Sequence, residues 1–253
     1  MRKVLIACTA GAALLAGVAH AVPTLSNTVY RIEASNALGS GFLEFTIADG
    51  SYPDADSFEL FMMTPMDIVD SFDGVTVVAQ LTQATLTVFD LPDFKQMSMS
   101  YAIGAFDGET TFRIVSGLFS FGAVNGPEGF ASAALGVTEQ DNPENGANHT
   151  PNGPLGKSHH TYYNGQAPAG TNFSRLVGGF GTIPGPGGNS ADMNEGTGPT
   201  LIPGNVSSLS QELLFKISGG DIANGTVTFG VTPEPTSAAA LLGLALLVVA
   251  RRR

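Results

Sequence analysis

The sequence has no tryptophan, one cysteine (Cys8) and only 11 Lys and Arg residues among 253. A single cysteine excludes an internal disulfide framework. The scarcity of basic residues argues against binding to nucleic acid or anionic membranes, because both attract positive charge. Without tryptophan the chain lacks the broadest aromatic platform for sugars. The tyrosines that remain for that role are Tyr30, Tyr52, Tyr101, Tyr162 and Tyr163.

The first 21 residues have the pattern of a secretory signal peptide. Arg2 and Lys3 form a basic start, Val4 to Val18 is apolar, and Ala19-His20-Ala21 supplies small residues for cleavage. We therefore expect signal peptidase to cut between Ala21 and Val22. A lipoprotein signal ending at Cys8 is the alternative, but too few residues precede Cys8 for an apolar region.

The other long apolar run lies at the C-terminal end. Ala238 to Ala250 contains only Ala, Leu, Val and one Gly, and Arg251, Arg252 and Arg253 follow it. As a helix this run would span roughly 20 Å, which is short for a bilayer core of about 30 Å. A buried core helix is the alternative, but the run has no polar face and ends in three like charges. We expect a short transmembrane helix with a cytoplasmic arginine cluster.

The order of Pro233-Glu234-Pro235, an apolar run and terminal arginines resembles the PEP-CTERM sorting signal of Gram-negative bacteria. The resemblance is limited to residues 233–253. It implies that Pro233, Glu234 and Pro235 form the motif read by an exosortase, and that Arg251 to Arg253 retain the precursor. It also implies a transient inner-membrane precursor, later delivery to the cell surface or the extracellular space, and an association with exopolysaccharide.

Residues 22–232 remain as one exported domain with strongly acidic composition. Of the 11 basic residues five lie in the two terminal segments, and of the 22 acidic residues only Glu234 does, so this domain has six basic and 21 acidic side chains and a net charge of −15. It contains no cysteine, so packing must hold it together.

Alternation of apolar and polar residues dominates residues 27–123. Met97, Met99, Tyr101 and Ile103 alternate with small polar residues, as expected for antiparallel strands with one solvated face. The apolar positions change parity between Leu81 and Ala84, which predicts a bulge or tight turn. We predict an all-β, jelly-roll-like antiparallel sandwich, with a signal helix before it and an apolar helix after it.

Residues 125–208 differ in composition from the preceding part. Gly, Pro and Asn make up 36 of these 84 residues, against 14 of the 103 residues from 22 to 124. Because these residues favour turns and interrupt strands, we predict a loop-rich insertion with few short strands, such as 173–180. Alternation returns at Leu209, and Ser218 to Asp221 predicts the turn of a closing hairpin.

Two groups of side chains are candidates for metal binding. Asp49, Asp54, Asp56 and Glu59 place several carboxylates in one short segment, which would suit calcium, although the spacing is not that of an EF-hand. A weaker group is Asp67, Asp70 and Asp73. His149, His159 and His160 lack a zinc-ligand spacing, and we expect them to be exposed. No other cofactor is expected.

Three functions remain open from the sequence. The first is a non-enzymatic structural or adhesive protein of the cell envelope or matrix, because no catalytic motif such as G-x-S-x-G is present. The second is a carbohydrate-binding module, with or without calcium. The third is a secreted glycoside hydrolase, which needs two carboxylates about 5 to 10 Å apart.

Overall fold

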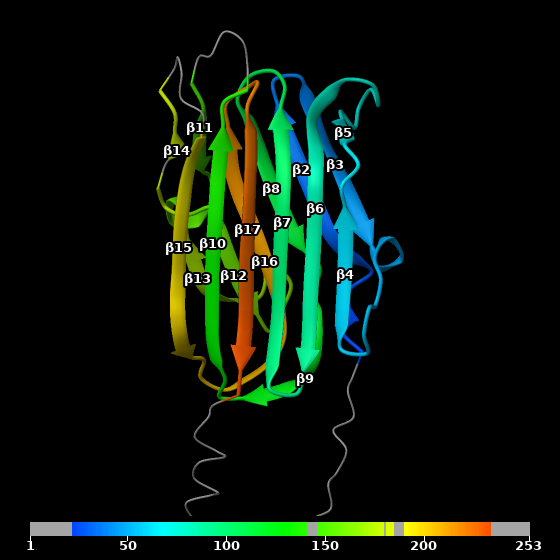
Figure 1. Ribbon diagram of the computed structural model, residues 1–253, viewed down its shortest axis with the longest axis vertical. Coiled ribbons are helices and arrows are strands. Elements are labelled where there is room, and N and C mark those ends of the chain that lie inside the picture. The colour runs from blue at the N-terminus through cyan, green and yellow to red at the C-terminus, as the bar shows by residue number, and fades with distance from the viewer. Residues whose placement is uncertain (1–21, 141–145, 180, 185–189, 234–253) are drawn as a thin grey trace, which may run out of the picture.

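The protein is an antiparallel β-sandwich of two sheets (Figure 1). The computed structural model describes residues 22–140, 146–179, 181–184 and 190–233. The predicted signal peptide, residues 1–21, and the predicted tail helix and arginine cluster, within 234–253, lie outside these residues. In the described part the helical segments are two short 3₁₀ turns, η1 (Ile47–Asp49) and η2 (Pro154–Gly156). None of its helices has the length and apolar character needed to span a bilayer.

Sheet A has ten strands, and its main path runs β1-β9-β16-β8-β2-β3. The strands of this path are β1 (Thr24–Leu25), β2 (Thr28–Asn36), β3 (Gly39–Thr46), β8 (Thr110–Ser116), β9 (Phe119–Asn125) and β16 (Asn205–Ile217). Four further strands extend the sheet from β16: β11 (Asn148–Pro151), β12 (His159–Tyr163), β13 (Thr171–Leu176) and β14 (Gly181–Thr182).

Sheet B has seven strands in the order β15-β10-β17-β7-β6-β4, with β5 also paired to β6. They are β4 (Ser57–Met62), β5 (Met66–Val69), β6 (Val77–Leu91), β7 (Phe94–Ala105), β10 (Glu128–Thr138), β15 (Ser190–Leu201) and β17 (Ile222–Thr232). All its pairings are antiparallel. The last strand, β17, therefore lies between β10 and β7 in the middle of the sheet.

Strand formation in sheet B follows the alternation in the sequence. Met97, Met99, Tyr101 and Ile103 on β7 are buried, and the residues between them are half-buried on the other face. The predicted change of parity is confirmed, because the register of β6 against β7 shifts between Leu81 and Gln83. This bulge keeps apolar side chains on the core face of β6 from Ala79 to Val88.

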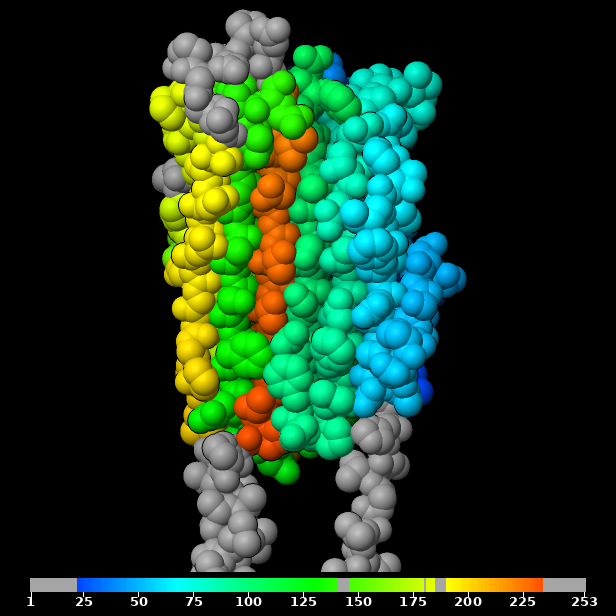
Figure 2. All heavy atoms as spheres, viewed as in Figure 1, coloured from blue at the N-terminus to red at the C-terminus, as the bar shows by residue number. Residues whose placement is uncertain are grey.

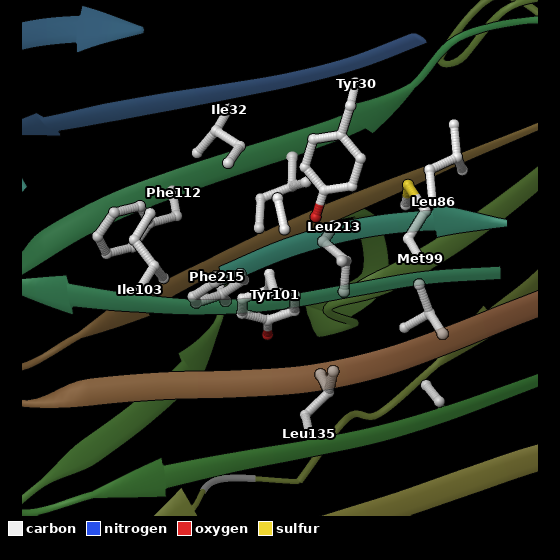
Figure 3. Packing of buried hydrophobic residues seen from close by; sticks show 14 of the residues in the cluster. Tyr30, Ile32, Leu86, Met99, Tyr101, Ile103, Phe112, Leu135, Leu213 and Phe215 are labelled. Atoms are coloured by element: carbon white, nitrogen blue, oxygen red, sulfur yellow. The ribbon is translucent and has the colours of Figure 1, made fainter. Parts of the chain in front are cut away.

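Aromatic and aliphatic side chains from both sheets fill the space between them (Figure 3). Tyr101 of sheet B stacks on Phe215 of sheet A, with ring centroids 5.4 Å apart, and Phe215 also stacks on Phe112 at 5.5 Å. Stacked aromatic pairs contribute beyond the area that they bury. This core fixes the sheets face to face and leaves each with one outward face.

Polar side chains also connect the two sheets, and two of them, Tyr30 and Gln211, are fully buried. Tyr30 of β2 donates its hydroxyl to the backbone carbonyl of Ser100 on β7, at 3.1 Å. Gln211 of β16 donates its side-chain amide to the backbone carbonyl of Met97, which is also on β7, at 2.9 Å. Because buried polar atoms must find partners, these bonds fix the position of one sheet relative to the other.

The prediction that residues 125–208 are mostly loop is wrong. This segment forms β10 to β15 and begins β16, and it completes both sheets. Small residues hid the pattern, because the core face of β10 is built from Ala131, Ala133, Leu135 and Val137. The edge strand β15 has few apolar residues, since most of its side chains are exposed. Much of the Gly, Pro and Asn content lies in the connections between these strands.

The predicted closing hairpin is also wrong. The two strands form as expected, but β16 belongs to sheet A and β17 to sheet B. The turn at 218–221 therefore crosses from one sheet to the other. Alternation indicates which residues face the core, but the partner of a strand depends on contacts far away in the sequence.

Candidate functional site

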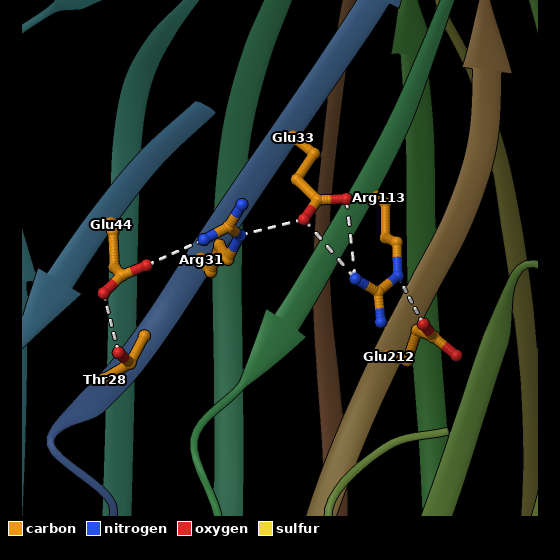
Figure 4. A network of polar contacts seen from close by, with 6 residues as sticks. All are labelled: Thr28, Arg31, Glu33, Glu44, Arg113 and Glu212. Carbon is orange, nitrogen blue, oxygen red and sulfur yellow. Dashed lines mark hydrogen bonds and ion pairs between the residues drawn. The ribbon is translucent and has the colours of Figure 1, made fainter. Parts of the chain in front are cut away.

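Charged side chains line the outer face of sheet A, where five residues form one continuous network (Figure 4). Arg31 and Glu33 lie on β2, Glu44 on β3, Arg113 on β8 and Glu212 on β16. The registers of these strands bring the five together, since Arg31 pairs with Glu44 and Glu33 with Arg113. We call these five residues the arginine network.

Each arginine of the network is held between two carboxylates. Arg31 donates to Glu33 at 2.8 Å and to Glu44 at 2.9 Å. Arg113 donates to Glu212 at 2.7 Å and lies 3.5 Å from Glu33. Within the described residues, neither arginine uses its remaining nitrogen, Nη2, in a hydrogen bond or an ion pair. Both guanidinium groups are therefore fixed in position while retaining free donors.

The charges of the network stabilise one another. Partial burial opposes the charged form of Arg31, but hydrogen bonds to Glu33 and Glu44 outweigh it and raise the pKa of Arg31. Hydrogen bonds from Thr28 and Arg31 lower the pKa of Glu44. The Glu212 side chain is only 3% exposed, so Arg113 is its main compensating charge.

Two grooves lie on either side of the arginines, and both are lined by Arg31 and Arg113. The first, of about 400 Å³, has Phe42 in its wall; the second, of about 390 Å³, is bounded by Gln166 and Ala167. The guanidinium of Arg31 lies 4.1 Å from the centre of the Phe42 ring, and Phe42 is 48% exposed. Planar polar groups and an aromatic ring thus meet at one surface.

The histidines are buried, so the expectation that they are exposed is wrong. His149, His159 and His160 lie on β11 and β12 and have no exposed surface. His159 and His160 point to opposite faces, as adjacent strand residues must. His159 contacts Gln211 in the core at 2.9 Å, and His160 contacts the carbonyl of Lys157 at 3.0 Å.

Burial keeps these imidazoles neutral. Desolvation lowers the pKa of His149 to about 4 and that of His159 to about 3. The ring of His149 stacks on Phe215, with centroids 4.9 Å apart. Groups of three or more His, Cys, Asp or Glu side chains close enough to hold a metal ion are absent from the described residues.

The acidic calcium candidates lie in the segment before and within β4. Asp49 accepts hydrogen bonds from the backbone and hydroxyl of Thr46, and so caps η1. Asp54 is exposed, and Glu59 is an outward residue of β4. Of the second group, Asp70 accepts from the backbone of Ser40 and Asp73 from Val75 and Thr76. The carboxylates with these contacts stabilise turns locally.

The residues that the sequence predicts to be processed lie at or beyond the limits of the described chain. Val22 is 55% exposed, and Pro233 is exposed at the end of β17. Ala21, Glu234, Pro235 and Arg251 to Arg253 lie outside the described residues. The blue start of the described chain and the end of β17 lie at the same end of the sandwich (Figure 1).

The surface aromatics differ from those expected in the sequence. Tyr30, Tyr101 and Tyr162 are buried, and Tyr52 packs edge-on against Phe58. The exposed rings on the sheet faces are Phe42 on sheet A and Phe61 on sheet B. Their signal was present in the sequence, because Phe42 and Phe61 have the opposite parity to the core residues of β3 and β4.

No family model matches the sequence, and no curated protein matches it. Among solved structures, a carbohydrate-binding module, TmCBM61 in complex with β-1,4-galactotriose, is similar at 12% identity and a TM-score of 0.28, covering 57% of this chain and 85% of that one. CsCBM6-3 from Clostridium stercorarium, in complex with cellobiose, matches at 15% identity and a TM-score of 0.18, covering 59% and 82%. A structure of infectious bursal disease virus, Gx strain, matches at 11% identity and a TM-score of 0.25, covering 87% and 59%.

Proposed function

We propose that this protein is an exported, non-enzymatic β-sandwich that binds polysaccharide at the bacterial cell surface or in the extracellular matrix. The observation that carries the proposal is the arginine network between two grooves, with Phe42 beside it. Concave surfaces with a few fixed polar groups and an aromatic wall are typical of small-ligand sites.

The network suits sugar hydroxyls because its polar groups are already in place. The free Nη2 atoms of Arg31 and Arg113 can donate to hydroxyl oxygens, and the remaining lone pairs of the carboxylates can accept from hydroxyl protons. The five residues constrain one another, so little side-chain entropy is lost when a ligand binds. The open part of the Phe42 ring offers an apolar surface for the C–H face of a sugar.

A glycoside hydrolase is a poorer fit to the same residues. A general acid needs a carboxyl group whose pKa is raised so that it holds a proton near neutral pH. In the network the pKa of Glu44 is lowered, and Glu33 and Glu212 are both paired with arginine. Each of these carboxylates is therefore engaged as the partner of an arginine.

The test is binding to a glycan array with matched variants. Phe42→Ala removes the aromatic wall and should weaken binding about tenfold, or about 1.4 kcal/mol. Phe72→Ala is the control, because Phe72 is 97% exposed in the β5–β6 loop and lies outside both grooves. If neither the wild type nor the control variant binds any glycan, with or without calcium, the proposal is refuted. Loss of binding in EDTA would show that the binding depends on calcium.

Delivery to the surface is the second part of the proposal. We propose that signal peptidase releases the chain after Ala21 and that an exosortase processes the precursor at Pro233 to Pro235, after a short apolar helix has held it in the inner membrane. Deleting residues 233–253 should send the domain to the periplasm or the medium without a membrane-bound precursor. Identical fractionation of the full-length and truncated chains would exclude this route.

A further inference from the structure

The middle of the outer face of sheet B carries two rows of residues in which most side chains are small and polar. One row crosses six strands in the order Phe61, Thr85, Ser100, Thr226, Ala134 and Asn194. A parallel row contains Glu59, Thr87, Ser98, Thr228, Ser132 and Gly196. We call these two rows the hydroxyl array. At about 4.8 Å between strands, each row is roughly 24 Å long.

The array is uncharged across its centre although the whole chain has a net charge of −11. The charged member is Glu59 on β4, at one edge of the sheet. Ser100 and Thr226 share a hydrogen bond of 2.9 Å, and Ser98 and Thr228 share one of 3.0 Å. Each hydroxyl has one donor and two acceptor sites, so every pair keeps capacity for an outside partner.

Two adjoining grooves, of about 580 and 440 Å³, lie over this face and share Ala134, Asn194 and Thr226. The larger groove adds the amides of Gln83 and Asn224 and the carboxylate of Asp192, and the smaller groove adds Glu195, which is paired with Lys157. Both carboxylates lie on the edge strand β15. Phe61, which is 70% exposed, stands at the β4 end of the row that passes through the grooves. Figure 2 shows this face along most of its length, with β17 as the central stripe.

We infer that the outer face of sheet B is a second binding site, and that its ligand is an extended, neutral polysaccharide. Hydroxyls and amides match the hydroxyls and ring oxygens of sugars. An anionic ligand would be repelled by Asp192 and Glu195 at the β15 side of the grooves, and the uncharged centre of the array offers a cationic ligand no opposite charge. Phe61 provides an apolar platform at one end. The arginine network occupies the other sheet, so one domain has two sites on opposite faces and can connect two polysaccharide chains. This connecting role rests on the proposed function of sheet A.

The experiment compares two single variants and their combination on soluble neutral polysaccharides, a β-1,4-galactan and a mixed-linkage β-glucan. Ala134→Lys places a long charged side chain in both grooves of sheet B at an exposed strand position. Thr232→Lys, at the end of β17 and outside both grooves, is its control. Phe42→Ala tests sheet A. Thermal unfolding shows whether each variant is folded.

We expect the wild type and Thr232→Lys to bind and to increase the particle size of the polysaccharide in light scattering. Each single variant should still bind, with affinity about tenfold lower, and should no longer increase particle size; the double variant should not bind. If Ala134→Lys is folded and has the same affinity and the same effect on particle size as the wild type, the second site is overturned and the site proposed on sheet A is unaffected. If Phe42→Ala binds as tightly as the wild type and Ala134→Lys does not bind at all, the function proposed for sheet A is overturned instead. Absence of binding by the wild type would overturn both.

Discussion

His149 lies flat against Phe215, with the two ring planes at 17° and the centroids 4.9 Å apart. Neither ring nitrogen has a hydrogen-bond partner within the described residues, and the side chain has no exposed surface. Such an imidazole packs as an aromatic ring only while it is neutral. Protonation would place a charge in the core next to Phe215.

The first prediction is a loss of stability in mild acid. Folding lowers the pKa of His149 to about 4 and that of His159 to about 3, from 6.5. A lowered histidine pKa means that the unfolded chain binds the proton first, so stability is full above pH 6.5 and falls as pH decreases toward pH 4. Each such group contributes about 1.4 kcal/mol per pH unit in that window. Melting temperature against pH measures it.

His149→Phe should reduce this dependence, because phenylalanine keeps the ring stack and cannot take a proton. The expected change is a smaller decrease in melting temperature between pH 7 and pH 4.5 than in the wild type. An unchanged slope would show that His149 is not among the groups that destabilise the fold in acid.

The second prediction concerns the hydrogen bond across the core. Tyr30→Phe removes the hydroxyl that bonds to Ser100 and leaves that buried carbonyl with one partner fewer, which should cost about 1 kcal/mol. Urea unfolding measures the loss. Tyr52→Phe is the control, because Tyr52 is exposed, and it should change stability by less than about 0.5 kcal/mol. Equal effects of the two substitutions would contradict the role of the inter-sheet bond.

The third prediction concerns Glu212. Arg113→Met removes the charge that compensates a carboxylate with almost no exposure, and should cost about 3 to 5 kcal/mol. Adding Glu212→Gln should recover part of this loss, because the remaining buried group is then neutral. A double-mutant cycle in urea gives the coupling. Additive effects would mean that the pair is not coupled.

The fourth prediction concerns two glycines in strands. A Cβ on Gly41 of β3 would overlap the backbone carbonyl oxygen of Val69, so β3 and β5 approach closely only because residue 41 has no side chain. Gly41→Ala should destabilise the fold by about 1 to 3 kcal/mol. At Gly122 of β9 a Cβ meets nothing within 4 Å, so Gly122→Ala should be neutral or slightly stabilising. Similar melting temperatures for both variants would contradict this difference.

Much of the fold follows from the local pattern of the sequence. The all-β class, the antiparallel strands of residues 27–123 and the bulge at Leu81 to Gln83 were all predictable, since each depends on period-two alternation. The strands of residues 125–208 were missed because alanine on β10 gives a weak apolar signal and β15 is largely exposed. The high content of glycine and proline indicates the connections correctly, but it does not indicate the strands between them.

The candidate surfaces were not predictable in the same way. Arg31, Arg113 and Glu212 are spread over 182 positions and meet only because β2, β8 and β16 are neighbours. The serines and threonines of sheet B are individually ordinary and form an array only through the registers of six strands. The local density of carboxylates instead predicts a calcium site at Asp49 and Asp54, although Asp49 caps a turn.

The central position of β17 has a mechanical consequence. It pairs with β10 over 11 residues and with β7 over ten, and its last residues lead directly to Pro233. A force applied at Pro233 therefore acts along the strand and loads both ladders in shear, so that many hydrogen bonds must break together instead of one after another. A protein tethered by that end would resist being pulled apart by flow.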